Sequence, residues 1–258
     1  MEAITDVKQF VGRTQEFATS RYGNAHLKYW YRGQADATWE LSPKLYRPSP
    51  TEPVLNNHAI WKKECSMMRN WRLMSASIRN SSASDEQLYF LAQHYGMPTR
   101  LLDWTTNPLI ALYFASSGHK DANGKVFMLD LQHWELPRQP GGAPFGVASG
   151  RRPGFKAWMD HIFNWRNNKA TRDNLISHTF PVRPEHFERR IILQQGCFTF
   201  HDPDHRIMEE KPPVQVLEIA KVAQEQILAE LAALNINHFS VFGDLEHLAK
   251  HLGESWRL

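Results

Sequence analysis

The chain has 258 residues, of which 42% are hydrophobic and 22% charged, as expected for a globular protein with a sizeable core. The formal net charge is only +3, no apolar run is long enough to span a bilayer, and the N-terminus lacks the pattern of a signal peptide. Because Cys65 and Cys197 form no metal or redox motif, we expect a protein of the reducing cytoplasm, with no metal and no membrane partner.

The N-terminal part of the chain combines two helices with a strand between them. Apolar residues at helical spacing predict a helix over 5–21 and a long helix over 54–79. Between these helices, residues 26–31 are rich in aromatic side chains and predict a buried strand that delivers Arg32 and Gly33 at its end.

Arg32 needs a partner if it lies at the end of a buried strand. A guanidinium keeps its charge in a protein, and burying one without a partner costs several kcal/mol. The partner is either a carboxylate of the chain, Asp103 or Asp36, or an anionic ligand. Arg100 lies three residues before Asp103 and could pair with it, so we expect a structural role for Arg100 and leave Asp103 open between a structural and a functional role.

The middle of the chain carries clear start and stop signals. A helix over 85–95 has N-cap candidates in the preceding serines and is closed by Gly96. The chain is then extended, because Pro98 disfavours helical geometry in the residue before it. Asn107 is expected to cap a further, buried helix that Gly118 ends.

The second half of the chain mixes strands and helices without regular alternation. It predicts strands over 125–131, 190–193, 197–201 and 214–219, a long loop over 135–154, and helices over 221–234 and 244–252. This order favours an α+β fold with a mostly antiparallel sheet over a doubly wound parallel sheet. We expect one domain over 1–258, with its core at about 26–252 and a helical N-terminal part.

Residues 151–172 form a basic segment interleaved with aromatic residues. They contain six Lys or Arg residues, one Asp and four Phe or Trp residues. Cations neutralise phosphates and aromatic rings stack on unpaired bases, so the segment predicts a surface for single-stranded nucleic acid. An acidic protein partner is the alternative. The candidate residues are Arg151, Arg152, Lys156, Trp158 and Trp165.

Three segments of the chain together resemble the FRG domain family. They are YRG at 31–33, HYGMPTRLLDWTTNPLIALYFA at 94–115 and RIILQQGCFTF at 190–200. VFGDLEHLAKHL at 241–252 looks like the family's usual ending, so the resemblance spans about residues 30–252.

The order of these segments is also similar to that in ADP-ribosyltransferases. In those enzymes an arginine-bearing motif, a Ser/Thr-bearing motif and a Glu-bearing motif surround NAD. The likeness implies an α+β fold with a split, mostly antiparallel sheet, packed helices and a cleft for NAD as substrate. At the place of the glutamate this chain has Gln194 and Gln195, which carry no charge.

The likeness implies a role for each site residue. Arg32 would bind the pyrophosphate through charge-assisted hydrogen bonds, and Gly33 would let the backbone approach it. The implied NAD contacts are Tyr31, Arg32, Gly33, Tyr95, Trp104 and Thr105, and the implied catalytic residues are Gln195, Asp103 and His94. For Trp104 a core position is the alternative, and for His94 a stabilising position at a helix C-terminus.

These implications predict ADP-ribosyl transfer from NAD to a macromolecule. We expect RNA as the acceptor ahead of protein, and a role as a toxin or antiphage effector with an antitoxin protein as a further partner. The alternatives are a non-catalytic FRG module that binds a nucleotide or nucleic acid, and an NAD glycohydrolase. The segment HDPDH at 201–205 is expected to be a hairpin tip rather than a metal site.

Overall fold

The computed structural model describes residues 2–19, 29–48, 55–78, 82–118, 121–131, 148–149, 153–164, 178–185, 188–208 and 214–256. The strands are β1 (Tyr29–Gln34), β2 (Leu101–Thr105), β3 (Gly124–Asp130), β4 (Ala148–Ser149), β5 (Phe180–Arg183), β6 (Gly196–Phe200) and β7 (Val214–Ile219). The helices are α1 (Val7–Thr19), α2 (Asn57–Met74), α3 (Asp85–His94), α4 (Pro108–Ser116), α5 (Pro153–Phe163), α6 (Arg189–Leu193), α7 (Gln224–Ala233), α8 (His238–Phe242) and α9 (Leu245–Ser255). Short 3-10 turns occupy Lys44–Tyr46 and Lys221–Ala223.

In the part of the chain that the structure describes, the strands form one sheet in the order β4-β5-β6-β2-β1-β3-β7. Neighbouring strands are antiparallel, except that β4 and β5 are parallel. The predicted α+β fold with a mostly antiparallel sheet is therefore confirmed. The sheet divides at its centre, because β1 and β2 pair only through Tyr31 and Thr105.

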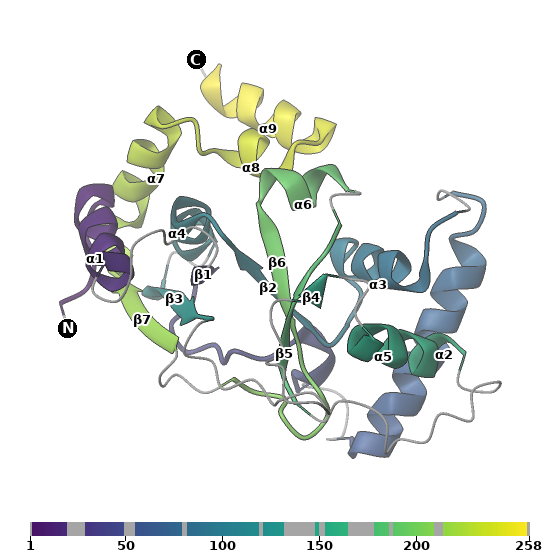
Figure 1. Ribbon diagram of the computed structural model, residues 1–258. Coiled ribbons are helices and arrows are strands. Elements are labelled where there is room, and N and C mark those ends of the chain that lie inside the picture. Colours follow the sequence, from purple (N-terminus) through teal and green to yellow (C-terminus); the bar gives the residue numbers. More distant parts are fainter. Residues whose placement is uncertain are drawn as a thin grey trace.

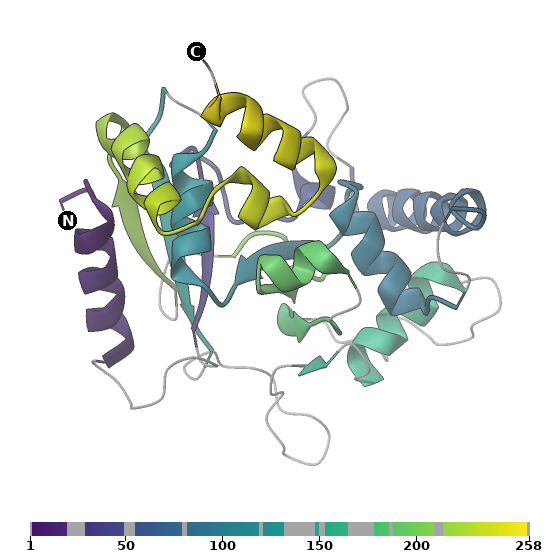
Figure 2. The ribbon, with the colours of Figure 1, turned by 90° about the horizontal axis from the view of Figure 1, so that it is seen from above.

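The helices gather over the two halves of this divided sheet (Figure 1). Helices α1, α4 and α7 share one core cluster with β1, β3 and β7, and helices α2, α3 and α5 share another with β2, β5 and β6. Helix α6 contacts α8, which contacts α9, and this group lies at one end of the sheet (Figure 2). None of the described helices is both long and apolar enough to cross a membrane.

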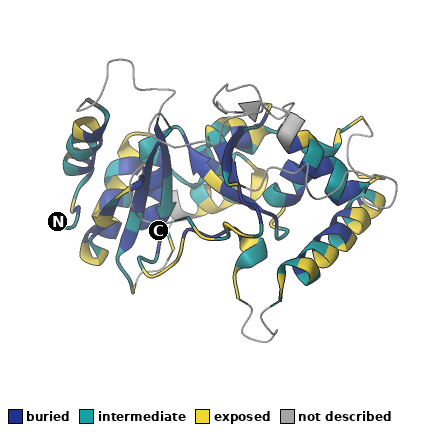
Figure 3. Cartoon of the chain, turned by 60° about the horizontal axis from the view of Figure 1, so that its bottom comes forward, coloured by how far each residue is buried: buried dark blue, intermediate teal, exposed yellow. Residues whose placement is uncertain are grey.

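The central strands are the most deeply buried elements (Figure 3). A third core cluster lies between the two halves, where Trp30 of β1 and Phe127 of β3 meet Leu102 and Trp104 of β2. These four side chains are at most 3% exposed. The halves are therefore joined by apolar packing rather than by a continuous hydrogen-bond ladder.

Gly33 allows helix α4 to lie directly against β1. A Cβ atom at Gly33 would stand 1.8 Å from the carbonyl oxygen of Ala111, and one at Gly124 would stand 2.1 Å from that of Ala115. Real Cβ atoms do not approach backbone so closely, so both positions require glycine. Gly33 also lines the cavity described below, so its expected close approach to a ligand stays a prediction beside this role in helix packing.

The predicted helix caps are confirmed where they can be checked. Ser84 forms a capping box with Gln87 at the start of α3. Asn107 accepts a hydrogen bond from the Leu109 amide, and Pro108 occupies the first position of α4. These local signals determine where α3 and α4 begin, the two helices that precede and follow β2 in the chain.

Several predicted boundaries are wrong. Residues 190–193 form helix α6 rather than a strand, and a turn at Gln194–Gln195, where Gln195 has a φ of 48°, separates this helix from β6. Arg32 lies inside β1, which continues to Gln34, rather than at the strand end. The long helix ends at Met74, and most of the predicted loop over 135–154 lies outside the described residues.

A buried ion pair joins α2 to the start of β2. Both side chains are 0% exposed, and the Glu64 carboxylate accepts hydrogen bonds from Arg100 Nε and Nη2 and from the Tyr89 hydroxyl. The guanidinium also lies over the Trp158 ring, 4.7 Å from its centroid. The predicted structural role of Arg100 holds, but its partner is Glu64 and not Asp103.

His201 is buried as a neutral imidazole. Its Nδ1 lies 3.0 Å from the carbonyl oxygen of His205, so this nitrogen carries the proton, and its Nε2 accepts from the Thr199 hydroxyl at 2.8 Å. The same hydroxyl accepts from Trp104 Nε1 at 3.0 Å. A second ring proton would leave the hydroxyl hydrogen without its acceptor.

We expect this histidine to make the protein less stable in mild acid. Burial lowers the pKa of His201 to about 3. The unfolded chain therefore takes up a proton near pH 6.5 that the folded chain refuses, and stability falls between about pH 6.5 and 3 by at most about 1.4 kcal/mol per pH unit. Urea unfolding at pH 7, 6 and 5 measures the slope. A His201→Gln variant should show a shallower one, and equal slopes would contradict the assignment.

Candidate functional site

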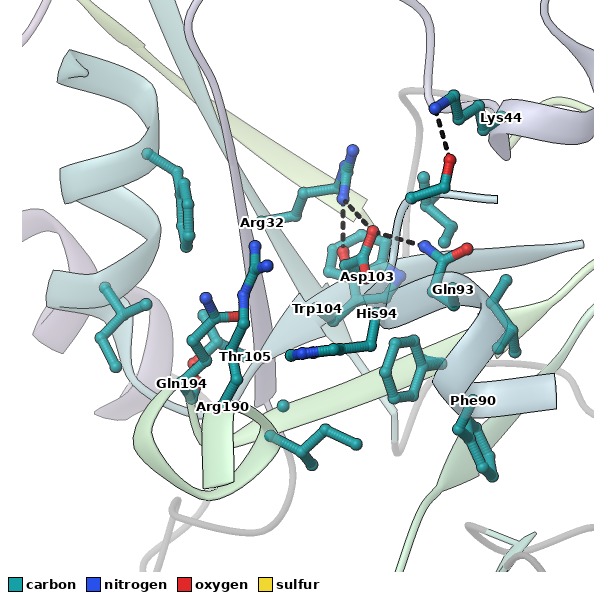
Figure 4. A pocket seen from close by; sticks show the side chains of 18 of the residues that line it. Arg32, Lys44, Phe90, Gln93, His94, Asp103, Trp104, Thr105, Arg190 and Gln194 are labelled. Atoms are coloured by element: carbon teal, nitrogen blue, oxygen red, sulfur yellow. Dashed lines mark hydrogen bonds and ion pairs between the residues drawn. The ribbon is translucent and has the colours of Figure 1, made fainter. Parts of the chain in front are cut away.

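A cavity of about 620 Å³ lies where the two halves of the sheet diverge. Its walls come from β1, β2, the C-terminal end of α3, and α6 with the turn that follows it. The volume is within the ~300–1,000 Å³ range of small-molecule and cofactor sites. Segments far apart in the sequence thus meet at one hollow (Figure 4).

The cavity wall is strongly cationic. Among the described residues that line it, four carry permanent positive charge and one is a carboxylate, Asp103. The cations are Arg32, Lys44, Arg47 and Arg190. Like charges gathered in a half-buried site repel one another, so this wall favours an anionic ligand.

Arg32 is only partly satisfied by the protein. Its Nη1 donates to the Asp103 carbonyl oxygen at 2.7 Å and lies 3.7 Å from the Asp103 carboxylate. Its Nε is buried and has no hydrogen-bond partner in the described structure. Burial lowers the pKa of Arg32 to about 10, although Asp103 acts in the opposite direction. The carboxylate therefore does not fully compensate the buried guanidinium.

Asp103 is held by a short chain of polar side chains. Its Oδ2 accepts from Gln93 Nε2 at 2.9 Å, and Gln93 Oε1 accepts from the Thr99 hydroxyl at 2.5 Å. The Asp103 side chain is 58% exposed, so it faces the open cavity while it is fixed in orientation. Figure 4 shows Arg32, Asp103 and Gln93 in this arrangement.

His94 lies deeper in the same cavity. Its side chain is 15% exposed, and its Nε2 is 3.9 Å from a carboxylate oxygen of Glu188. Burial lowers the pKa of His94, and the charge of Arg190 acts in the same direction. The imidazole is thus neutral at neutral pH and able to accept a proton.

The structure shifts the predicted glutamine by one position. Gln194 lines the cavity and its Nε2 is buried without a hydrogen-bond partner in the part of the chain described, whereas Gln195 is exposed. Gln195 has a φ of 48° and accepts from the Thr106 hydroxyl at 3.1 Å, which turns its side chain away from the cavity. The Thr105 hydroxyl donates to the Gln194 carbonyl at 2.6 Å and so fixes this turn.

The predicted aromatic contacts divide into two groups. Tyr31 and Trp104 line the cavity but are 5% and 3% exposed, and they belong to the core. Tyr95 is 66% exposed at the rim, edge-on to the His94 ring at 4.8 Å. Of these rings, only Tyr95 offers an open face to a ligand.

Comparison with known proteins bears on this cavity directly. The family model described as the FRG domain matches residues 27–124. The chain carries an FRG domain. No curated protein and no solved structure matches the chain. The extension of the FRG domain over the whole of 1–258 stays a prediction, since the matched segment ends at residue 124.

The FRG domain supplies most of the cavity. The matched segment holds β1, α3 and β2, and with them Arg32, Gln93, His94 and Asp103. Arg190 and the glutamine turn lie beyond it and complete the opposite wall. Two parts of the chain, one inside the matched segment and one outside, are therefore needed for the site.

The described residues of the predicted acceptor surface, Lys156 and Trp158, do not line the cavity. Trp158 is a residue of α5 whose side chain is 5% exposed and packs into the core, so its ring has no open face for a base. Lys156 is exposed and pairs with Asp160 at 3.3 Å. Arg151, Arg152 and Trp165 lie outside the described residues.

Sequence reasoning missed several residues of the site. Lys44, Arg47, Gln93 and Arg190 line the cavity without having been predicted, and Gln194, named together with Gln195, lines it in place of that residue. Arg190 and Gln194 stand in the quoted segment RIILQQG, and Gln93 directly precedes HYG, so their neighbourhood was a usable signal. Lys44 and Arg47 follow a turn-rich stretch and carried no comparable signal.

Proposed function

We propose that the FRG domain of this protein binds NAD in the cationic cavity and transfers its ADP-ribosyl group to a macromolecule. The observation that carries the proposal is the charge of this cavity wall, where four cations, Arg32, Lys44, Arg47 and Arg190, stand against one carboxylate, Asp103, among the described lining residues. Such a wall favours a ligand that brings negative charge, as the pyrophosphate of NAD does.

The cavity suits the chemical parts of NAD. The pyrophosphate matches the guanidinium of Arg32, with Arg47 close enough to add its charge. A ribose hydroxyl and the amide of Gln194 are complementary in hydrogen bonding. The face of Tyr95 suits the cationic nicotinamide ring.

Bond cleavage places positive charge on the ribose as nicotinamide leaves. Asp103 is the carboxylate that lines the described cavity wall, and Gln93 holds it in place. A fixed negative charge stabilises a developing cation without reorganisation, which is the main source of catalysis in such a step. We therefore assign this role to Asp103 in place of the missing glutamate.

Removing the Gln194 side chain should slow the reaction. We expect Gln194→Ala to reduce nicotinamide release from NAD at least tenfold, because the amide that faces the ribose is lost. Quantitative chromatography of nicotinamide measures the rate. Gln195→Gly is the matched control, because glycine accepts the positive φ at that position, and it should retain activity within about twofold. The reverse ranking of the two variants would contradict the assignment.

The amide of Gln194 also supports a second candidate function. An uncharged residue at this place activates a macromolecular acceptor poorly. Water can then take the place of that acceptor, as in an NAD glycohydrolase, or the site can bind NAD without turnover. Purified protein with labelled NAD and cell lysate separates the three functions. Label on a macromolecule supports transfer, nicotinamide release without such label supports hydrolysis, and binding without release supports a non-catalytic module.

The proposed reaction suggests a biological role for the protein. We extend the proposal to the role of a toxin or antiphage effector restrained by an antitoxin, because covalent transfer to an essential macromolecule would damage the cell that carries it out. Induced expression in a bacterial host tests this role. Growth arrest that Arg32→Ala relieves would support it, and normal growth with the wild-type protein would contradict it.

A further inference from the structure

A second cavity of about 1360 Å³ opens beside the cationic one. It lies between the C-terminal part of α2 and helix α3, and its lining includes Met67, Trp71, Met74, Ile78 and Leu91. Met74 is 78% exposed and Ile78 is 88% exposed. Large apolar side chains gathered around a hollow at the surface mark a binding site for another molecule.

The two cavities share a wall. Tyr95 and Met97 line both of them. Glu188 lines the second cavity, and its carboxylate lies 3.9 Å from His94 Nε2, which belongs to the first. A molecule seated in the second cavity therefore ends at a carboxylate beside the NAD site.

We propose that the second cavity is the acceptor site, and that it receives an apolar segment of a protein whose nucleophilic side chain is directed to Glu188. This inference rests on the proposed function. Glu188 acts as the base, and its carboxylate lies 3.9 Å from His94 Nε2 in the wall between the two cavities.

The transfer step balances with the groups already named. The bond between ribose C1′ and the nicotinamide nitrogen breaks, and its electron pair leaves with nicotinamide. The acceptor's oxygen, nitrogen or sulfur forms the new bond to C1′, and its proton passes to the Glu188 carboxylate and then to water. NAD and acceptor thus give ADP-ribosylated acceptor, nicotinamide and one proton, with no change in oxidation state.

The lining favours a polypeptide over a nucleic acid. Among the described residues of the second cavity, one is a cation, Lys63, and one is an anion, Glu188. Nucleic acid binding depends on several cations that neutralise phosphates, and this wall does not provide them. Methionine side chains adapt to varied apolar partners, which suits a groove that accepts a protein segment.

The experiment compares substitutions of exposed residues that line the second cavity with one of an exposed residue beside it. Wild type, Met74→Glu, Ile78→Glu and Leu73→Glu are incubated with labelled NAD and a dialysed bacterial lysate. Leu73 is the matched control, because it neighbours Met74 on α2, is 62% exposed and does not line the cavity. NAD affinity of each purified variant is measured by calorimetry.

We expect Met74→Glu and Ile78→Glu to lose at least tenfold of the macromolecular label, with NAD affinity within twofold of wild type. Leu73→Glu should label as wild type does. The wild-type label should resist ribonuclease and disappear with protease, and Glu188→Gln should lower the labelling rate at unchanged NAD affinity.

Three results would overturn the inference. Label that resists protease and disappears with ribonuclease would place a nucleic acid in the acceptor role. Met74→Glu and Ile78→Glu variants that label as well as wild type would show that the second cavity has no part in the reaction. A wild-type protein that binds no NAD in calorimetry would remove the proposed function and this inference with it, an outcome distinct from the other two.

Discussion

Replacing Arg32 by alanine is expected to weaken NAD binding at least tenfold. The Arg32 guanidinium lines the cavity and is compensated only in part by Asp103, so the pyrophosphate would supply the missing negative charge. A hydrogen bond to a charged group contributes about 1.5–3 kcal/mol, which exceeds the 1.4 kcal/mol of a tenfold change. Isothermal calorimetry with NAD measures the affinity of each variant.

Two further variants sharpen this experiment. Arg32→Lys keeps the charge but loses the planar fork, and we expect it to bind between wild type and Arg32→Ala. Arg13→Ala is the control, because Arg13 lies on α1 and pairs with Glu16 away from the cavity. It should bind NAD as wild type does.

Stability separates a ligand site from a structural salt bridge. Asp103 compensates the buried guanidinium only in part, so the unliganded Arg32→Ala variant should unfold within about 1 kcal/mol of wild type. A large loss of stability together with unchanged NAD affinity would instead identify the Arg32–Asp103 pair as structural.

Replacing Glu64 by glutamine is expected to destabilise the fold by about 3–5 kcal/mol. The change leaves the Arg100 charge in a fully buried site, where Nη1 already has no hydrogen-bond partner among the described residues. Tyr89 also loses its charged acceptor. Urea unfolding followed by tryptophan fluorescence measures the free energy of unfolding.

The double variant Glu64→Leu with Arg100→Met tests the cause. It removes both charges and keeps apolar volume, so we expect it to regain most of the loss. If the double variant is less stable than Glu64→Gln alone, the hydrogen-bond network rather than the unpaired charge carries the energy.

Local signals predicted much of the fold correctly. Ser84 and Asn107 start helices because their side chains satisfy free amides at a helix end, which depends only on neighbouring residues. The prediction for residues 190–193 failed because the three apolar residues that follow Arg190 fit both a strand and a helix. Its conformation is set by the packing of α6 against α8 and β6, which the sequence does not display.

The site was predicted in part, for a related reason. Asp103 was one of three partners left open for Arg32, beside Asp36 and an anionic ligand, and the structure shows a partial pairing with it. The choice between Gln194 and Gln195 depended on a single residue of register in a turn with positive φ. Arg100 was assigned to a nearby carboxylate, whereas its partner Glu64 is 36 positions away.

The contact between Gly33 and Ala111 changes how genetic data on this protein should be interpreted. Arg32 and Gly33 are adjacent in the chain, so a screen for inactive alleles is expected to return both. Any side chain at position 33 would push against the backbone of α4, which follows directly from the strand that carries Asp103. An inactive Gly33 allele therefore reports a displaced helix, whereas an inactive Arg32 allele bears on the proposed ligand contact.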